Sequence, residues 1–143
     1  MRYIPHRDVH QGIDIIDPSH AGAIRGEAVF VAHDGYVRRT GWEAGAGWRV
    51  TLEYVGLGSI NLPIVSRYMH LLYDTTPQAP LHARIKRGTR IGSVGTSGAS
   101  TGYHLHLDFN NRGITGALGA DMAMNPERFF PNTIFTGYSN RIP

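Results

Sequence analysis

The sequence predicts a mainly β protein built from antiparallel sheets. Short runs in which apolar and polar residues alternate recur along the chain, and 18 glycines and 8 prolines punctuate the 143 residues. Such turn residues between short alternating runs are typical of strands joined by tight turns. No segment keeps an apolar helical period for three turns, so any helices are expected to be short.

The predicted elements follow from local patterns. The clearest strand covers 48–55, where every second residue from Trp48 to Tyr54 is apolar. The other predicted strands are, in chain order, residues 29–32, 36–40, 67–72, 90–94 and 103–109. A short helical piece is predicted at 126–130. The segments predicted as cleft-flanking loops, because they are rich in glycine or lack periodicity, are 41–47, 56–65 and 96–102.

Length and composition indicate a single domain covering residues 1–143. A chain of this length can bury a core without disulfides, and it contains no internal repeat and no low-complexity linker. The absence of cysteine excludes disulfides and thiolate metal sites.

The charge pattern excludes some classes of partner. The net charge is +3, and the densest basic run lies at 84–90. We interpret this run as a solvated strand edge, protected by charge from mispairing, with weak attraction to anionic polymers as a second role. Nucleic-acid binding is not predicted, because no aromatic platform or recognisable module accompanies the charge. No apolar stretch reaches membrane-spanning length, and residues 1–5 lack the apolar region of a signal peptide.

The strand predicted at 103–109 carries the strongest chemical signal. Alternation places His104, His106 and Asp108 on one face, opposite an apolar face. Two histidines at this spacing lie about 6–7 Å apart at the backbone, so both rings can lean toward one point. They could form a pair of metal ligands or one ligand beside one acid/base group. The alternative is a solvated strand face without a chemical role.

Two weaker features lie earlier in the chain. His10 and Asp14 are four residues apart, a spacing that keeps both on one face in a strand or a helix. The alternative for this pair is a surface strand end before the turn at 17–19. His70 lies in the short apolar run 66–72, where a lone histidine is more often structural. Convergence of these three features would make a metal or acid/base site.

Other features are assigned no catalytic role. Residues 98–102 fit the G-x-S-x-G pattern of serine hydrolases, but that motif requires a helix after the serine, and an alternating strand follows here. The remaining histidines are His6, His20, His33 and His82, and we interpret them as surface or structural residues. This includes His6, although it lies only four residues before His10.

Together these motifs resemble the zinc metalloendopeptidases of the lysostaphin and LytM type, which cleave the peptide part of bacterial peptidoglycan. The family pattern is an early H-x-x-x-D, a middle His followed by Leu, and a late H-x-H in a strand. Its matches here are His10 with Asp14, His70 with Leu71, and His104 with His106. The segments 32–37, 95–102 and 125–129 are also similar to family motifs. The resemblance covers about residues 10–130, with the motifs in family order.

The resemblance implies a fold, a metal and a reaction. The fold would consist of antiparallel sheets of the LytM/lysostaphin peptidase (duplicated hybrid motif-like) type, with short helices and long cleft loops. One Zn²⁺ per chain would be held by His10, Asp14 and His106, leaving a fourth position for water. His70 and His104 would be catalytic, acting on the proton of the attacking water and on the oxyanion or leaving amine. Which of the two is the base stays open.

The implied function is zinc-dependent hydrolysis of the stem or cross-bridge peptides of peptidoglycan. The alternative is a catalytically silent domain of the same fold that binds zinc or wall peptides. The chain is expected to act outside the cytoplasm, as a monomer and as an excised or separately delivered domain, since peptidoglycan lies there and no signal peptide is predicted.

Departures from the family pattern leave the metal and catalytic positions intact. Tyr103 stands where proline is usual, and Asp108 where glutamate is usual. Asp108 shares the histidine face, so it could orient an imidazole, although its side chain reaches less far than that of glutamate. Only nine residues precede His10, fewer than is usual in the family. This difference affects the wall of the substrate cleft that upstream segments build, and not the metal centre.

Overall fold

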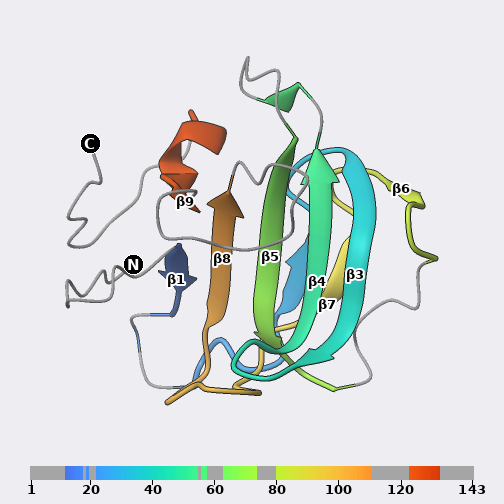
Figure 1. Ribbon diagram of the computed structural model, residues 1–143. Helices are drawn as coiled ribbons and strands as arrows, with labels where there is room; N and C mark the ends of the chain where they lie inside the picture. The colour runs from blue at the N-terminus through green and yellow to red at the C-terminus, as the bar shows by residue number, and fades with distance from the viewer. Residues whose placement is uncertain are drawn as a thin grey trace.

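The computed structural model describes residues 12–17, 19, 22–54, 56–57, 63–73, 80–110 and 123–132. In these segments the regular secondary structure is antiparallel β-sheet, apart from a short 3-10 helix near the end (Figure 1). The predicted fold class is therefore confirmed. No helix in the described segments is long and apolar enough to cross a membrane.

The strands form one large and one small sheet. In chain order the elements are β1 (Ile13–Ile15), β2 (Ala28–Phe30), β3 (Gly35–Glu43), β4 (Gly47–Tyr54), β5 (Ile64–Leu71), β6 (Arg84–Ile85), β7 (Arg90–Ser93), β8 (Leu105–Asn110), β9 (Ala123–Met124) and the 3-10 helix η3 (Pro126–Phe129). The large sheet has the order β1-β8-β5-β4-β3-β6, and β9 pairs with β8 beyond β1. The small sheet is β2-β7.

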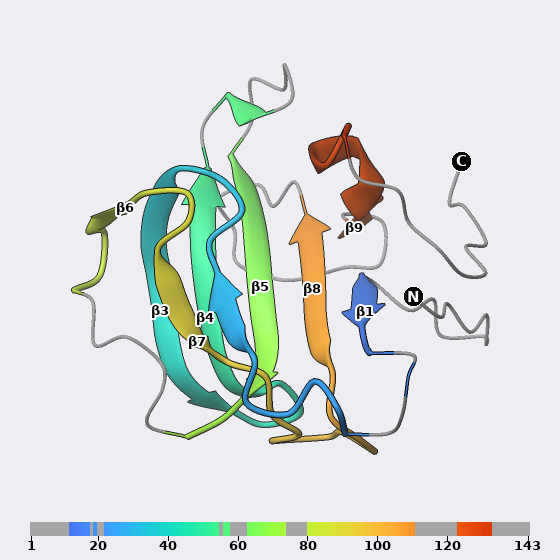
Figure 2. The same cartoon turned by 180° about the vertical axis from the view of Figure 1, so that it is seen from behind.

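The two sheets enclose the core. Figure 2 shows β2 and β7 in front of β3, β4 and β5, so the small sheet covers one face of the large one. Alternate residues of the strands point into this space; the largest fully buried side chains are Tyr54, Tyr68, Phe109, Leu52, Ile64, Leu71, Ile91, Val31, Val37 and Val50. Both buried tyrosine hydroxyls have partners, Ser66 Oγ at 2.8 Å from Tyr54 and the Ala32 amide at 3.0 Å from Tyr68.

The other side chains of the large sheet project from its opposite face, which we call the outer face. Alternation with core neighbours places on it Asp14 of β1, Arg49 and Thr51 of β4, Arg67 of β5, and His106, Asp108 and Asn110 of β8. These residues are polar or charged, in contrast to the largely apolar core face. The outer face is therefore the surface on which a site can form.

Two predicted boundaries were wrong. The predicted loop 41–47 is mostly strand, because β3 continues to Glu43 and the turn occupies only 44–46. Trp42 and Trp48 are cross-strand partners with ring centroids 5.8 Å apart, and this packing extends the hairpin past Gly41. Ile64 and Val65 likewise belong to β5 and not to a loop. The predicted loop at 96–102 and the short helix near 126–130 are confirmed.

Candidate functional site

Four predicted site residues meet at one end of the outer face. His106 Nδ1 lies 2.8 Å from Asp14 Oδ1, and His104 Nε2 lies 3.6 Å from the same oxygen. The His70 ring centroid is 4.8 Å from that of His104 and 6.1 Å from that of His106. His10, the fifth predicted residue, lies outside the described residues. The predicted convergence therefore holds for the four residues that can be compared.

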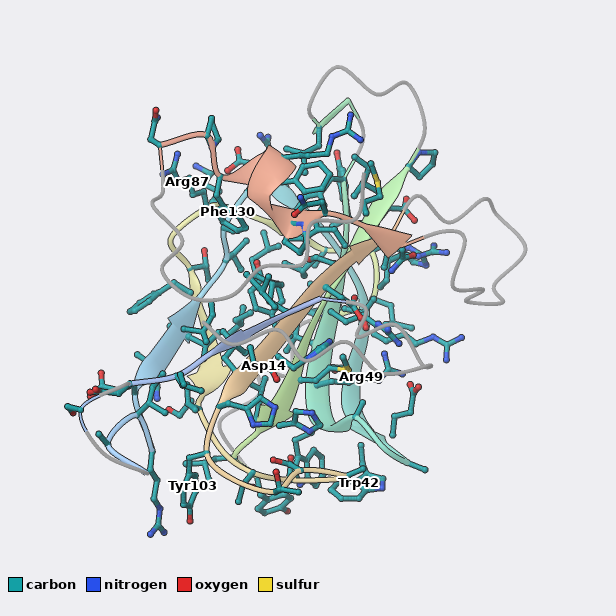
Figure 3. All side chains as sticks on the ribbon, turned by 90° about the vertical axis from the view of Figure 1, so that its left-hand side faces the viewer. Asp14, Trp42, Arg49, Arg87, Tyr103 and Phe130 are labelled. Atoms are coloured by element: carbon teal, nitrogen blue, oxygen red, sulfur yellow. The ribbon has the colours of Figure 1, made fainter. Side chains whose placement is uncertain are left out.

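Strand register brings this set together. Asp14 in β1 and Met69 in β5 are both direct cross-strand partners of His106 in β8. Cross-strand partners lie about 5 Å apart, so residues 92 positions apart in sequence become neighbours. Figure 3 shows Asp14 above Trp42 and Tyr103, which lie toward the same lower end of the molecule.

A β-bulge turns His70 toward this set. Ile64, Ser66 and Tyr68 alternate into the core, so regular alternation would also bury position 70 there. Instead β5 uses one more residue than β4, because Val50 pairs with Tyr68 while Trp48 pairs with Leu71. His70 takes the extra position with a φ of 61°, and Leu71 enters the core in its place. A bulge beside a site re-aims a side chain, and left-handed backbone at a non-glycine residue is typical of functional positions.

The loop at 96–102 fixes the ring of His70. His70 Nδ1 lies 2.7 Å from the carbonyl oxygen of Ser97. Because a carbonyl only accepts, Nδ1 carries the proton and donates, which leaves the Nε2 lone pair of the neutral ring unused by this bond. Burial lowers the pKa of His70 and outweighs the hydrogen bond to Ser97, while the neighbouring His104 and His106 lower it further. His70 is thereby prepared to accept a proton at Nε2.

His104 is held in the same way. Its Nδ1 lies 2.8 Å from the carbonyl oxygen of Gly102, so Nδ1 donates there. Its Nε2 then faces Asp14 at 3.6 Å. Both histidines therefore have Nδ1 tied to the backbone, and His104 turns Nε2 toward the pair formed by Asp14 and His106.

Ser97 links this loop to two strands. Its hydroxyl donates to the carbonyl of Leu71 at 2.7 Å and accepts from the amide of Trp48 at 2.9 Å. The amide of Ala99 donates to Gly45, and the amide of His70 donates to Ala46, both in the turn between β3 and β4. The turn, the loop and the bulge are thus one interlocked unit that determines where His70 lies.

Gly47→Ala is expected to disturb this unit. A Cβ at Gly47 would lie 2.5 Å from the carbonyl carbon and oxygen of Ser97, at a φ of +69°. Backbone atoms cannot move aside as a side-chain end can, so we expect lost stability and a displaced Ser97 carbonyl. Gly45→Ala is the matched control, because its φ is +84° but no atom lies within 4 Å of its Cβ.

Only the backbone strain, about 1–2 kcal/mol, should therefore appear in Gly45→Ala. Chemical denaturation of both variants measures the difference in the free energy of unfolding. Equal destabilisation of the two variants would show that the contact with Ser97 does not hold the loop.

His106 and Asp14 fit a metal ion as far as they are described. Oδ1 of Asp14 and Nδ1 of His106 face each other, and both are donor atoms that zinc accepts in proteins. Gly12 makes room for the ring, since a Cβ there would lie 2.7 Å from His106 Nε2. Among the residues that the structure describes, no group of three His, Cys, Asp or Glu side chains is arranged to hold a metal ion. A catalytic zinc usually takes three protein ligands, so Asp14 and His106 would supply two of them.

Two carboxylates flank the ring of His106: Oδ1 of Asp14 accepts a hydrogen bond from Nδ1–H at 2.8 Å, and Asp108 lies near Nε2. Burial alone would lower the pKa of His106, but Asp108 and Asp14 outweigh burial and raise the pKa to about 9. Asp108 is in turn paired with Arg67, which donates Nε to Oδ1 and Oδ2 at 3.0 and 2.9 Å. The predicted closeness of Asp108 to an imidazole is thus present, with Oδ2 3.7 Å from His106 Nε2.

Sequence reasoning missed Arg67 and the individual role of Ser97. The signal for Arg67 was its alternation with the buried residues Ser66 and Tyr68, which places it on the outer face. Its pairing with Asp108 follows only once the strand order is known. Ser97 gave no such signal, because its backbone carbonyl and not its residue type contacts His70.

Residues assigned no catalytic role lie away from the site or in another context. His33 packs against Tyr54, Phe109 and Phe130, and His82 is exposed. Ser100 is followed by bends and then by β8, so the serine-hydrolase motif lacks its helix. The basic run 84–90 includes β6, an edge strand of the large sheet, as expected. His6 and His20 lie outside the described residues.

Comparison with known proteins supports the resemblance. The model of peptidase family M23 matches residues 8–118. The chain is 30% identical over 105 residues to the peptidoglycan DD-endopeptidase ShyC of Vibrio cholerae serotype O1, an alignment that covers 73% of this chain but 21% of ShyC. This chain therefore spans about a fifth of the length of that relative.

Solved structures of similar fold include peptidases. The catalytic domain of the antimicrobial peptidase lysostaphin from Staphylococcus simulans has a TM-score of 0.65 at 23% identity, covering 91% of this chain and 86% of that one. A zinc-containing peptidase from Vibrio cholerae has a TM-score of 0.54 at 28% identity, covering 71% of this chain and 26% of that one. The family model matches well over half of this chain, in agreement with the H-x-x-x-D, His-Leu and H-x-H motifs. This chain therefore belongs to peptidase family M23.

Proposed function

We propose that this protein is a zinc-dependent endopeptidase that hydrolyses peptide bonds in the stem or cross-bridge peptides of bacterial peptidoglycan. The observation that carries the proposal is the arrangement of four residues: Asp14 Oδ1 faces His106 Nδ1, while His70 and His104 stand beside this pair with Nδ1 tied to carbonyls. Membership of family M23 and the similarity to a peptidoglycan DD-endopeptidase support the substrate class.

The zinc ligands in this proposal are His10, Asp14 and His106, one metal per chain. Asp14 and His106 present donor atoms 2.8 Å apart, and His10 precedes Asp14 by four residues, so the short segment ending in β1 would supply two of the three ligands. Zinc held there would lower the pKa of a coordinated water and polarise the scissile carbonyl.

His70 and His104 would perform the proton transfers. Each has its proton on Nδ1 and an Nε2 lone pair available, so each can accept a proton from the attacking water. Once protonated, the same Nε2 can donate to the leaving amine or stabilise the oxyanion. Ser97 and Gly102 hold the two rings through backbone carbonyls, which keeps Nε2 of each ring as the reactive atom.

The setting follows from this substrate. Peptidoglycan lies outside the cytoplasm, so we place the activity there, in a single domain acting as a monomer. Support for the monomer is that one chain supplies all four described residues, from β1, from β5, from β8 and from the loop just before β8.

Peptide release from purified sacculi tests the proposal. Zinc-loaded protein should solubilise wall fragments with new amino termini, chelator should abolish release, and added zinc should restore it. Sacculi of several wall chemistries identify the bond that is cut. His70→Asn serves as the inactive control. Zinc-loaded protein that binds sacculi without creating new amino termini would contradict the proposal and indicate a catalytically silent wall-binding domain.

A further inference from the structure

We infer that Asp108, held in place by Arg67, is a positioning residue that fixes which nitrogen of His106 carries the proton. The inference rests on the proposed function, because it takes His106 as a zinc ligand. It concerns an ion pair that lies beside the predicted ligands and catalytic residues without belonging to either group.

The first observation is the geometry of the ion pair. Arg67 in β5 and Asp108 in β8 are direct cross-strand partners on the outer face. Arg67 Nε donates to both carboxylate oxygens, at 3.0 and 2.9 Å, and its NH2 group pairs with Oδ2. Such a fork restricts the rotation of the carboxylate as well as its position.

The second observation is burial. The Asp108 side chain is 3% exposed and that of Arg67 is 18% exposed. A buried carboxylate is costly unless a charge and hydrogen bonds compensate it, and removal of one partner leaves the other uncompensated. Arg67 therefore stabilises the carboxylate at this depth, two residues from His106.

The third observation is the direction of the carboxylate. Oδ2 of Asp108 lies 3.7 Å from Nε2 of His106, on the opposite side of the ring from the Nδ1 that faces Asp14. This separation exceeds a hydrogen bond, so a small ring movement is needed to form one. A histidine that binds metal through one nitrogen commonly donates its other N–H to a carboxylate, which fixes the tautomer and orientation of the ring.

The consequence is a series of contacts that runs from Arg67 in β5 through Asp108 to His106, the proposed metal ligand. The fork of Arg67 orients Asp108, and Asp108 accepts a hydrogen bond from Nε2–H. Nδ1, whose proton is donated to Asp14 in this structure, would give its lone pair to the metal once that proton is released. Without Asp108, a neutral His106 would keep its proton on Nδ1, where the Asp14 carboxylate accepts it, and zinc could not bind at that atom.

Zinc affinity of four variants of the full chain tests the inference, measured by competition with a chromogenic chelator. Asp108→Asn and Arg67→Gln should weaken zinc binding by about 10–100-fold, the usual effect of removing such a partner. Asp108→Glu keeps the carboxylate and should restore most of the affinity. Arg38→Gln is the matched control, because it removes an ion pair with Glu53 at 3.1 Å elsewhere on the large sheet.

A second readout separates positioning from a general structural role. Long-range proton–nitrogen NMR spectra of the zinc-loaded wild type should show His106 protonated at Nε2, whether or not the variants fold. A proton at Nδ1, or Asp108→Asn binding zinc as tightly as the wild type, would overturn the inference while leaving the endopeptidase proposal intact. A wild type that binds no zinc and releases no wall peptide would instead overturn the proposed function.

Discussion

His106→Ala is expected to reduce bound zinc from about one ion per chain to almost none and to abolish hydrolysis of wall peptides. The substitution removes the Nδ1 atom that faces Asp14 at 2.8 Å, and a site with three protein ligands does not retain zinc firmly with two. Elemental analysis of dialysed protein measures the metal, and peptide release from sacculi measures the activity.

The matched control for His106→Ala is His82→Asn. His82 is exposed and lies outside the site, and asparagine tolerates its left-handed φ of 66° better than alanine does. This control should keep its zinc. Because His106 projects from the outer face and not into the core, circular dichroism of His106→Ala should keep its β-sheet signal. Stoichiometric zinc in folded His106→Ala would show that the ligand assignment is wrong.

His70→Asn and His104→Ala are expected to keep zinc but to lower turnover by roughly a hundredfold or more, the usual effect of removing a general acid/base or an oxyanion donor. Both rings tie Nδ1 to a backbone carbonyl, an arrangement suited to proton transfer at Nε2. Asparagine is preferred at position 70 because a φ of 61° strains most other residues. Zinc content measured beside the hydrolysis rate checks both variants.

The two measurements separate the possible errors. Loss of zinc in His104→Ala would mean that His104 and His106 had been assigned each other's roles. Unchanged turnover in either variant would remove that histidine from the mechanism. Retained zinc with lost turnover in both variants is the result that the geometry predicts.

Alternation predicted the part of the site that lies on regular strand. The H-x-H spacing placed His104 and His106 on one side, and Asp108 with them, because side chains two residues apart share a face. Strand β8 begins only at Leu105, so His104 reaches the site from the end of a loop held by its bond to Gly102. The H-x-H spacing therefore placed His104 on the correct face, although His104 itself lies just before the strand.

The position of His70 could not be derived from alternation. Regular alternation from Ile64 to Tyr68 would bury His70, and only the extra residue of the bulge turns the ring outward. The bulge depends on contacts with the turn at 44–46 and with Ser97, which are distant in sequence. The family resemblance, not the periodicity, identified His70 before the structure did.

The β3–β4 hairpin and the ion pair of Arg67 with Asp108 likewise could not be predicted from local sequence patterns. Gly41 and Gly45 suggested a loop, but cross-strand packing of Trp42 on Trp48 continues the strands to Glu43 and Gly47. The pairing of Arg67 with Asp108 requires the order β5-β8, which one sequence does not specify. Local patterns predicted the elements, whereas register and strand order determined which side chains meet.

The most direct test of the account is a crystal structure of the zinc-loaded protein with anomalous diffraction recorded at the zinc edge. The account predicts one peak per chain, about 2.0–2.2 Å from Asp14 Oδ1, from His106 Nδ1 and from a nitrogen of His10. His70 and His104 should lie near this peak without binding it. A peak coordinated by His70 or His104 in place of His10, or bound through His106 Nε2, would contradict the central claim.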